Sequence, residues 1–308
     1  MDLSRQELVI GKEAQKKLEN SKIVIVGLGA LGSLTAELLV RSGVKNLVLI
    51  DRDYIESSNL QRQHMFVVSD IGEPKVKVSE KYLKKINSKI KVKSFFDNLD
   101  HNNVNLLESD LVLDCTDNLQ TRFLINDYCK KNKINWIFSS AIKGHGYVFN
   151  VLPEGPCFNC IFESLTSSDT CETVGVMNTI TSLISSLQVN EAIKLLIGKK
   201  SESDLIYVNI NENNILKIKV NKKKLCNVCN GNFEYLSGEK TEKLIKLCGR
   251  GNFLFEKTKK INKKKFDRIK DWGKVFKYKE MTVFPDKILI KAKSEKDARS
   301  LYSKYVGN

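Results

Sequence analysis

Two short patterns in this sequence constrain its fold more than any other feature. A glycine-rich loop, GLGALG at residues 27–32, lies near the amino terminus, and two Cys-x-x-Cys pairs, Cys157/Cys160 and Cys226/Cys229, lie downstream of it. The loop is typical of a nucleotide-binding α/β domain, and paired cysteines are typical of a structural zinc site. Together they indicate a nucleotide-binding domain with a metal clamp, a combination that most dehydrogenases lack.

Length and composition allow one large domain and one small one. The chain has 308 residues, of which 42% are hydrophobic, enough to fill a sizeable core. No apolar run reaches the length of a membrane span, and residues 1–5 lead into no signal segment. We therefore expect a cytoplasmic protein with no membrane partner, in which paired cysteines bind zinc and do not form disulfides.

Apolar runs alternate with helical patterns along the first two thirds of the chain. Strands are expected at 21–26, 46–50, 91–95, 111–114 and 136–139, and helices at 30–41, 74–86, 119–131 and 176–197. A further strand at 146–152 has an antiparallel character, and the polar segment 164–173 is expected to form a mobile crossover loop. This order predicts an α/β fold, with a Rossmann-like, mostly parallel sheet that continues into antiparallel strands.

The composition changes after the last cysteine pair. We place a boundary near Leu236, so that a nucleotide-binding domain with the zinc site covers 1–236 and a small basic α+β extension covers 237–308. From Tyr235 to Asn308 there are 21 Lys and Arg against 9 Asp and Glu, a balance of +12 within a total of +15. Such a surface is either simply solvated or a docking face. Because basic and aromatic residues do not alternate, nucleic acid is not expected, whereas an acidic protein partner stays open.

The glycine loop and Asp51 form the first candidate site. Glycines allow the backbone to approach a phosphate or a ribose, and the helix that follows offers unpaired N–H groups. Asp51 lies 22 residues after Gly29, at the end of the second strand, where its carboxylate can accept both ribose hydroxyls. The alternatives are a tight turn without a ligand, or the nucleotide site of an NAD-dependent oxidoreductase.

Three charged residues indicate a triphosphate instead. Arg62 lies in a polar stretch after Asp51, Lys75 begins a helix, and Asp117 follows the strand at 111–114. In an open parallel sheet, ligands bind at the carboxyl ends of the strands. Arginine and lysine there can neutralise phosphates and aspartate can hold Mg²⁺. Taken singly, each residue could instead be a surface cation or, for Asp117, a helix cap.

The sequence closely resembles the MoeB/ThiF family, the adenylyltransferases that activate ubiquitin-like sulfur carriers and share ancestry with ubiquitin-activating enzymes. The resemblance covers residues 1 to about 236, and 237–308 are similar to a C-terminal extension of some members. The matching stretches are Ser4-Arg5-Gln6, VGLGALG at 26–32, LIDRDYIESSNLQRQ at 49–63, GEPKV at 72–76, LVLDCTDN at 111–118, CFNC at 157–160, TCETVGVM at 170–177, SLQVNEAIKLLIG at 186–198 and CNVC at 226–229.

The resemblance implies a role for each matching site residue. The nucleotide would be bound by three parts of the chain. They are the glycine loop (Gly27, Gly29, Ala30 and Gly32), Asp51, which would hold the ribose, and a segment around the phosphates (Ser58, Asn59, Leu60, Gln61 and Arg62). Lys75 would reach the α-phosphate, and Asp117, with Asn118 beside it, would bind Mg²⁺. Arg5 would reach into the neighbouring subunit's site, which implies a homodimer.

The implied reaction joins two anions. The C-terminal glycine carboxylate of a small Gly-Gly protein attacks the α-phosphorus of ATP, giving an acyl-adenylate and pyrophosphate. Cations screen the repulsion and no strong base is needed, which suits a chain with only three histidines. Cys171 matches the loop cysteine that family members can use for a thioester or persulfide link, although it can equally be a passenger. The resemblance also implies a separate sulfur donor.

Three functions therefore stay open: the carrier-activating adenylyltransferase, an NAD-dependent oxidoreductase, and a non-catalytic scaffold that binds a ubiquitin-like protein. Within the first, the sequence does not choose among molybdopterin, thiamine, tRNA thiolation and protein conjugation pathways. For residues 237–308 we predict, from their charge, a role in holding an acidic carrier.

Overall fold

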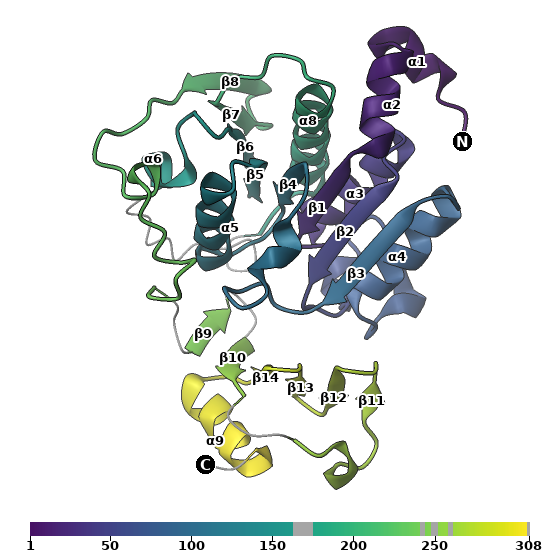
Figure 1. Ribbon diagram of the computed structural model, residues 1–308. Helices are drawn as coiled ribbons and strands as arrows, with labels where there is room; N and C mark the ends of the chain where they lie inside the picture. Colours follow the sequence, from purple (N-terminus) through teal and green to yellow (C-terminus); the bar gives the residue numbers. More distant parts are fainter. Residues whose placement is uncertain (163–174, 241–243, 248–251, 258–260, 307–308) are drawn as a thin grey trace. The chain divides into compact units, whose positions relative to one another are not determined.

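The computed structural model describes residues 1–162, 175–240, 244–247, 252–257 and 261–306 (Figure 1). The chain divides into two compact units, Met1–Glu239 and Lys240–Asn308, and each unit has its own sheet. Among the helices of the described ranges, none combines the length and the apolar character needed to cross a membrane.

Unit 1 is built on an eight-stranded sheet with the order β3-β2-β1-β4-β5-β6-β7-β8. The first five strands of this order pair in parallel, and the remaining pairs are antiparallel. The strands are β1 (Lys22–Val26), β2 (Asn46–Asp51), β3 (Lys91–Phe96), β4 (Leu111–Asp114), β5 (Asn135–Ile142), β6 (His145–Val151), β7 (Asp204–Asn209) and β8 (Asn214–Lys219). β1 and β4 lie inside the sheet, and their buried apolar runs, residues 23–26 and 111–113, suit strands that are covered on both faces.

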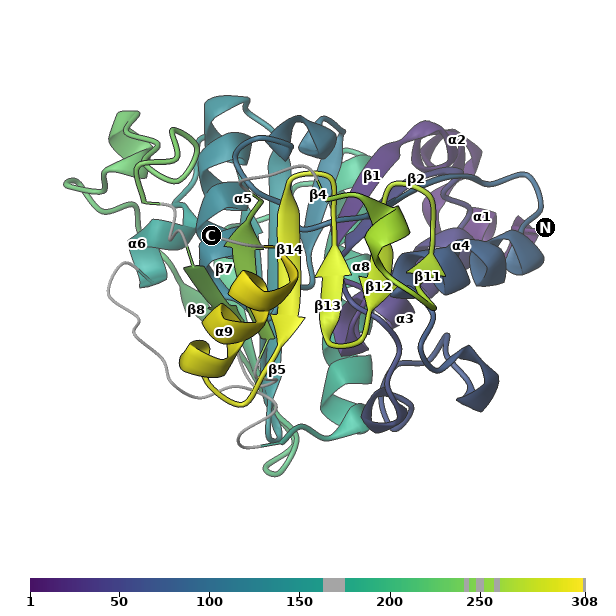
Figure 2. The same cartoon turned by 90° about the horizontal axis from the view of Figure 1, so that it is seen from below.

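Helices cover both faces of this sheet. Figure 2 shows α3, α4 and α8 on one face and α5 on the other. The helices are α1 (Ser4–Ile10), α2 (Lys12–Asn20), α3 (Ala30–Arg41), α4 (Lys75–Ile86), α5 (Leu119–Lys131), α6 (Phe158–Phe162) and α8 (Asn178–Leu196). Short 3-10 turns are η1 (Ser57–Asn59), η2 (Val68–Asp70), η3 (Val104–Leu107) and η4 (Val228–Asn230).

A large apolar cluster of unit 1 lies between the sheet and α5. Trp136 and Phe149 of the sheet and Phe158 of α6 are fully buried in it, together with side chains of β1, β2 and β4. Phe158 contacts the rings of Phe123 and Phe138. This packing joins the segment that carries the first cysteine pair to the parallel half of the sheet. It stabilises the fold mainly through the burial of apolar surface.

One helix differs from its prediction. The helix expected at 176–197 begins at Asn178, because Val176 pairs with Lys143 in an isolated parallel bridge. Its buried face also includes Thr181, Ser185 and Gln188 beside the apolar residues. Helical periodicity identified the helix, but it could not indicate that polar residues face the core.

In the described residues of unit 2, a six-stranded antiparallel sheet is accompanied by the helix α9. The strand order is β11-β12-β13-β14-β10-β9. The elements are β9 (Leu244–Leu247), β10 (Asn252–Glu256), η5 (Lys263–Lys265), β11 (Lys270–Asp271), β12 (Phe276–Tyr278), β13 (Met281–Val283), β14 (Lys287–Lys291) and α9 (Glu295–Tyr305). Phe253, Ile288 and Ile290 form a core with Ala298, Leu301 and Tyr302 of α9.

The predicted fold class is confirmed. A mostly parallel sheet continues into antiparallel strands, and a separate α+β unit follows it. The domain boundary at residue 236 and the roles assigned to the two parts stay predictions.

Candidate nucleotide and metal sites

The glycine loop connects β1 to α3 through a turn that excludes side chains. Gly27 has a φ of 88°, and a Cβ there would lie 2.6 Å from the carbonyl oxygen of Cys115. A Cβ on Gly32 would lie 1.9 Å from the carbonyl oxygen of Gly27. The first turn of α3 can therefore pack on the loop only because these residues are glycines. Gly29 is the N-cap, and no side chain caps the helix, so its first N–H groups are available to an anion.

Asp51 lies beside this loop at the carboxyl end of β2. One carboxylate oxygen accepts a hydrogen bond from the N–H of Leu28 at 2.5 Å, and the other accepts from the N–H of Asp53 at 2.6 Å. Burial raises the pKa of Asp51, and the charge of Lys75 partly opposes this shift. Each oxygen keeps a second lone pair, so the oriented carboxylate can still accept hydroxyl groups.

Lys75 is the first residue of α4 and only 2% exposed. Its ammonium lies 3.3 Å from a carboxylate oxygen of Asp53, and its N–H donates to the carbonyl of Asp53 at 3.0 Å. A buried lysine needs an anionic partner to remain charged. The structure thus brings Lys75 to the loop after β2, near Asp51, as the sequence predicted for one edge of the sheet.

The segment between β2 and α4 makes a tight turn that contains Ser58 to Arg62. Asn59 is fully buried and accepts a hydrogen bond from the N–H of Glu56 at 3.1 Å, while its Nδ2 has no partner within the described ranges. Arg62 is half-buried and donates to the carbonyl of Ser58 at 2.9 Å. Leu60 is half-buried and Gln61 is exposed. The guanidinium of Arg62 therefore folds back on its own turn.

Asp117 and Asn118 follow β4 and have different roles. Asn118 is the N-cap of α5, since its side chain accepts from the N–H of Thr121 at 2.9 Å. Asp117 is exposed, and we find no hydrogen bond or ion pair for its carboxylate with any described residue. The cap that the sequence left open for Asp117 is thus provided by its neighbour, and the carboxylate of Asp117 can meet a ligand.

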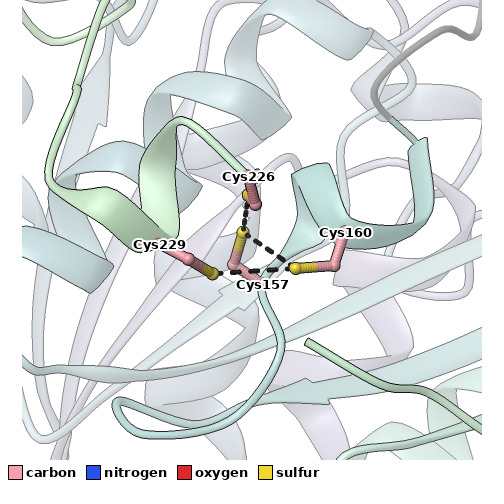
Figure 3. Close-up of side chains that lie close together, drawn as sticks. All are labelled: Cys157, Cys160, Cys226 and Cys229. Atoms are coloured by element: carbon pink, nitrogen blue, oxygen red, sulfur yellow. Dashed lines mark hydrogen bonds between the residues drawn. The ribbon is translucent and has the colours of Figure 1, made fainter. Parts of the chain in front are cut away.

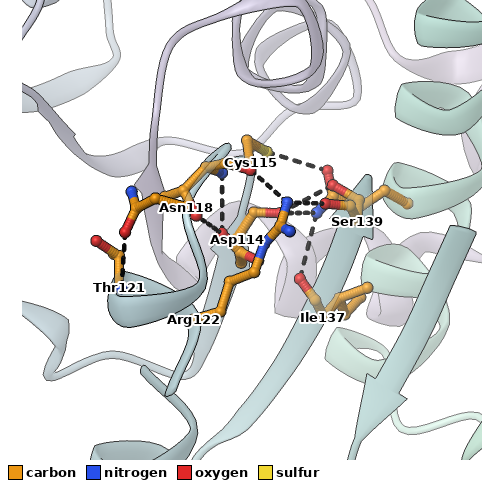
Figure 4. A network of polar contacts seen from close by, with 9 residues as sticks. Asp114, Cys115, Asn118, Thr121, Arg122, Ile137 and Ser139 are labelled. Atoms are coloured by element: carbon orange, nitrogen blue, oxygen red, sulfur yellow. Dashed lines mark hydrogen bonds and ion pairs between the residues drawn. The ribbon is translucent and has the colours of Figure 1, made fainter. Parts of the chain in front are cut away.

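A buried ion pair behind Asp117 was not predicted. Asp114, with no exposed surface, binds Arg122 of α5 at 3.2 Å, and Arg122 also donates to the carbonyl of Thr116 at 2.5 Å (Figure 4). Burial raises the pKa of Asp114, and the charge of Arg122 lowers it in part. The signal in the sequence was an aspartate that ends a wholly apolar strand, because such a carboxylate requires a cation.

Gln188 of α8 completes this network. Its amide accepts from Thr35 at 3.0 Å and from the thiol of Cys115 at 3.3 Å, and it donates to the carbonyls of Asp114 and Ile137. Burial raises the pKa of Cys115 to about 12, so this thiol is unreactive. The network joins α3, α8, β4 and β5 directly under the loop that leads to Asp117.

Arg5 lies far from these residues. It is exposed on α1, which is attached through Gln6, whose amide donates to the carbonyl of Ser42 at 2.8 Å. Ser42 follows the carboxyl end of α3, whereas the glycine loop precedes its amino end, and 12 helical residues span about 18 Å. Arg5 therefore does not reach the site of its own chain. Cys171 lies outside the described residues.

The four cysteines converge on one point (Figure 3). Cys157 and Cys160 lie at the start of α6 and within it, and Cys226 and Cys229 lie around η4. The sulfur–sulfur distances are 3.5 Å for Cys157–Cys226, 3.6 Å for Cys160–Cys229 and 3.9 Å for Cys157–Cys160, and all four sulfurs lie within 4.8 Å of one another. A zinc tetrahedron with bonds of about 2.3 Å requires sulfurs about 3.8 Å apart, so the cluster fits Zn²⁺.

Known proteins share this architecture and sequence. Residues 3–228 match the ThiF family. The chain belongs to the ThiF family. The sulfur carrier protein ThiS adenylyltransferase of Bacillus subtilis (strain 168) is 35% identical over 258 residues, which cover 80% of this chain and 77% of the relative. The molybdopterin-synthase adenylyltransferase of Escherichia coli (strain K12) is 34% identical over 224 residues, which cover 70% of this chain and 90% of the relative.

The chain is also similar to an archaeal E1 enzyme and to a solved bacterial structure. The SAMP-activating enzyme E1 of Haloferax volcanii is 34% identical over 200 residues, which cover 63% of this chain and 74% of the relative. A crystal structure of E. coli MccB with MccA-N7isoASN has a TM-score of 0.66 at 25% identity and covers 75% of this chain and 74% of that one. The prediction of a MoeB/ThiF-family adenylyltransferase is confirmed by the family match and by the names of these relatives.

Proposed function

We propose that this chain uses ATP to adenylylate the C-terminal glycine carboxylate of a small ubiquitin-like protein. The observation that carries this proposal is the convergence of the glycine loop, Asp51, Lys75 and the free carboxylate of Asp117 at the carboxyl edge of one parallel sheet, in a ThiF-family chain. Relatives named for ThiS, for SAMP and for molybdopterin synthase indicate the class of partner.

The site suits an exchange of bonds at phosphorus. The carrier carboxylate forms a bond to the α-phosphorus while the bond from this atom to the bridging oxygen breaks, and pyrophosphate leaves. Lys75 and Arg62 offset the charge of the phosphates, and Asp51 orients the ribose. Asp117 would hold Mg²⁺, which supplies further positive charge to the leaving phosphates when bound. The attacking group is already ionised, so no residue has to remove a proton.

The cysteine cluster would hold a structural Zn²⁺ ion. Four thiolates close the tetrahedron and leave no position for a substrate. The ion would join α6 to η4. Cys157 and Cys226 are 69 residues apart in the sequence, and so are Cys160 and Cys229. Its contribution is therefore to stability and not to the reaction.

Two copies of the chain would complete each site. Arg5 is remote from its own nucleotide loop, and Leu8 and Val9 on the same helix are 88% and 79% exposed, which favours a partner subunit on α1. We propose a homodimer in which Arg5 acts in the other subunit's site. A separate sulfur donor and a covalent link through Cys171 belong to later steps of the same proposal.

The test of the reaction is carrier-dependent exchange between ATP and labelled pyrophosphate. The wild-type chain should catalyse exchange only when a Gly-Gly carrier is present, and Lys75→Ala and Asp117→Ala should lower the rate at least about a hundredfold. Lys84→Ala is the matched control, because Lys84 lies on the same helix but only pairs with Glu80 at the surface. Exchange that is absent from the wild type would favour an oxidoreductase or a scaffold. Unchanged rates in the variants would refute the site.

The test of the shared site is subunit complementation. Arg5→Ala and Asp117→Ala should each be inactive as homodimers. A mixed dimer contains one site with both residues intact if Arg5 acts in trans, so mixing the two variants should restore activity. Mixtures that stay inactive, although mass spectrometry shows the mixed dimer, would contradict the arrangement.

A further inference from the structure

The side-chain amide of Gln63 is a buried polar group without a function so far. Gln63 is 2% exposed, and its Oε1 has no hydrogen-bond partner among the residues that the structure describes. Buried polar atoms in folded proteins are nearly always paired, because an unpaired one loses its hydration without compensation. An unpaired amide oxygen in this position therefore points to a partner that is not part of the chain.

The surrounding structure holds this amide against the glycine loop. The N–H of Gln63 donates to the carbonyl of Asn59 at 2.9 Å, and its carbonyl accepts from Phe66 at 3.2 Å, so its backbone is fixed in the turn. Its Nε2 lies 4.0 Å from the position that a Cβ would take on Gly29. Gly29 is the N-cap of α3, and no side chain caps that helix. The amide of Gln63 thus lies beside the uncapped helix terminus.

A second buried amide supports the same direction. Asn59, one turn before Gln63, is fully buried, and no residue in the described part of the chain pairs with its Nδ2. An unpaired acceptor on Gln63 and an unpaired donor on Asn59, four residues apart, are costly in an empty core, yet they are useful beside a ligand that offers both donors and acceptors. A nucleotide offers phosphate oxygens as acceptors and ribose hydroxyls as donors.

We propose that Gln63 binds the nucleotide where the ribose meets the first phosphate. The N–H of Leu28 orients Asp51, the ribose residue, and the next residue, Gly29, begins the helix terminus that faces the phosphates. Gln63 lies at Gly29, between these two functions. Its Nε2 donates to an oxygen of the α-phosphate, and its Oε1 accepts from a ribose hydroxyl. The inference rests on the proposed function, and it adds a residue that discriminates nucleoside phosphates from free phosphate.

The test compares two buried glutamines in the full-length chain. Gln63→Met removes the amide but keeps the length of the side chain. The control is Gln15→Met, since Gln15 is also 2% exposed but fully paired, donating to Ser42 at 3.1 Å and accepting from Gln6 at 2.7 Å. Dissociation constants for ATP and AMP are measured by calorimetry, and stability without nucleotide is measured by urea unfolding.

We expect the two variants to separate binding from folding. Gln63→Met should bind ATP and AMP about tenfold more weakly, while its stability without nucleotide is unchanged or higher, because an unpaired buried amide has been removed. Gln15→Met should be less stable and bind both nucleotides as the wild type does. Gln63→Glu, which lacks the donor and repels phosphate, should bind more weakly still.

Two results would overturn the inference. One is wild-type affinity for ATP and AMP in Gln63→Met or in Gln63→Glu. The other is a loss of stability in Gln63→Met as large as that in Gln15→Met, which would assign Gln63 to the fold. A wild-type chain that binds no ATP would instead count against the proposed function, so the two failures can be told apart.

Discussion

Gly27 and Gly32 of the nucleotide loop must be glycine because a Cβ at either position would collide with backbone atoms. The Cβ positions of Gly27 and Gly32 collide with the carbonyl oxygens of Cys115 and Gly27, whereas the Cβ position of Gly29 is 4.0 Å from its nearest neighbour. A collision with backbone cannot be relieved by a change of rotamer, so the two kinds of glycine should respond differently to substitution.

Gly32→Ala should therefore destabilise the protein by about 3 kcal/mol, because the first turn of α3 must move away from the loop. Gly29→Ala should cost less than about 1 kcal/mol, since its φ is −77° and space for a methyl group exists. Urea unfolding of both variants provides the measurement. Equal losses of stability would contradict this description of the loop.

At the level of elements, the Asp114–Arg122 ion pair connects β4 to α5 behind the loop that carries Asp117. Arg122 also lies over the ring of Phe138, with 4.9 Å from its guanidinium carbon to the ring centroid. A buried pair contributes little to net stability, but the loss of one partner leaves a buried charge. The pair should therefore determine how stability depends on pH.

Arg122→Met should lower the free energy of unfolding by about 3–5 kcal/mol near pH 7. Burial already raises the pKa of Asp114 in the folded state, so stability from this group falls as pH rises from its unfolded pKa through the raised value. The charge of Arg122 lowers the pKa of Asp114. Removal of Arg122 therefore raises this pKa further and extends to higher pH the range over which stability falls. The loss should then be smaller near pH 4 than near pH 7.

Urea unfolding at both pH values checks this expectation. Arg299→Met is the control, since Arg299 forms an exposed pair with Glu295 and should change stability by less than about 0.5 kcal/mol. The double variant Asp114→Asn/Arg122→Met should regain part of the loss. The same deficit at both pH values would argue against a buried charge as its cause.

The cysteine cluster is a second feature that connects separate elements, since its ligands come from the segments around α6 and η4. Metal analysis should find one zinc ion per chain in the wild type, and Cys226→Ser/Cys229→Ser should lose it together with about 4 kcal/mol or more of stability. Cys129→Ala, which alters a buried cysteine of α5 outside the cluster, should keep its zinc. Full stability after removal of the metal by a chelator would show that the cluster is dispensable.

Over the whole molecule, the positive charge is concentrated in the C-terminal part of the chain. The balance of +12 from Tyr235 onward makes unit 2 much more basic than unit 1. We propose that this charge attracts an acidic carrier, since long-range complementarity raises association rates and depends on salt.

Charge reversal of Lys293, Lys296 and Lys304, which are exposed in unit 2, should weaken carrier binding by about tenfold and reduce its dependence on salt. The matched control reverses Lys77, Lys81 and Lys84 on α4 of unit 1 and should leave the affinity almost unchanged. Affinity is measured by calorimetry at two ionic strengths. If both triple variants bind alike, the basic unit has another purpose.

The amino-acid sequence by itself determined the elements and the edge of the sheet to which the candidate site residues are brought. Strands and helices follow from short-range periodicity, and the carboxyl ends of parallel strands bring Asp51, Lys75 and Asp117 to one edge whatever the details of packing. The cysteine pairs predicted their own convergence, because four thiols at this spacing have few other uses.

Only the tertiary structure decided which polar groups are paired and which are left for a ligand. The cap on α5 belongs to Asn118 and not to Asp117, Arg122 neutralises Asp114, and the amide of Gln188 is satisfied while that of Gln63 is not. Apart from the local cap by Asn118, these distinctions depend on partners 8 to 153 residues away in the chain, within hydrogen-bond distances of about 3 Å. Local sequence patterns contain no information on contacts of that range, since the packing of α3, α5 and α8 on the sheet creates them.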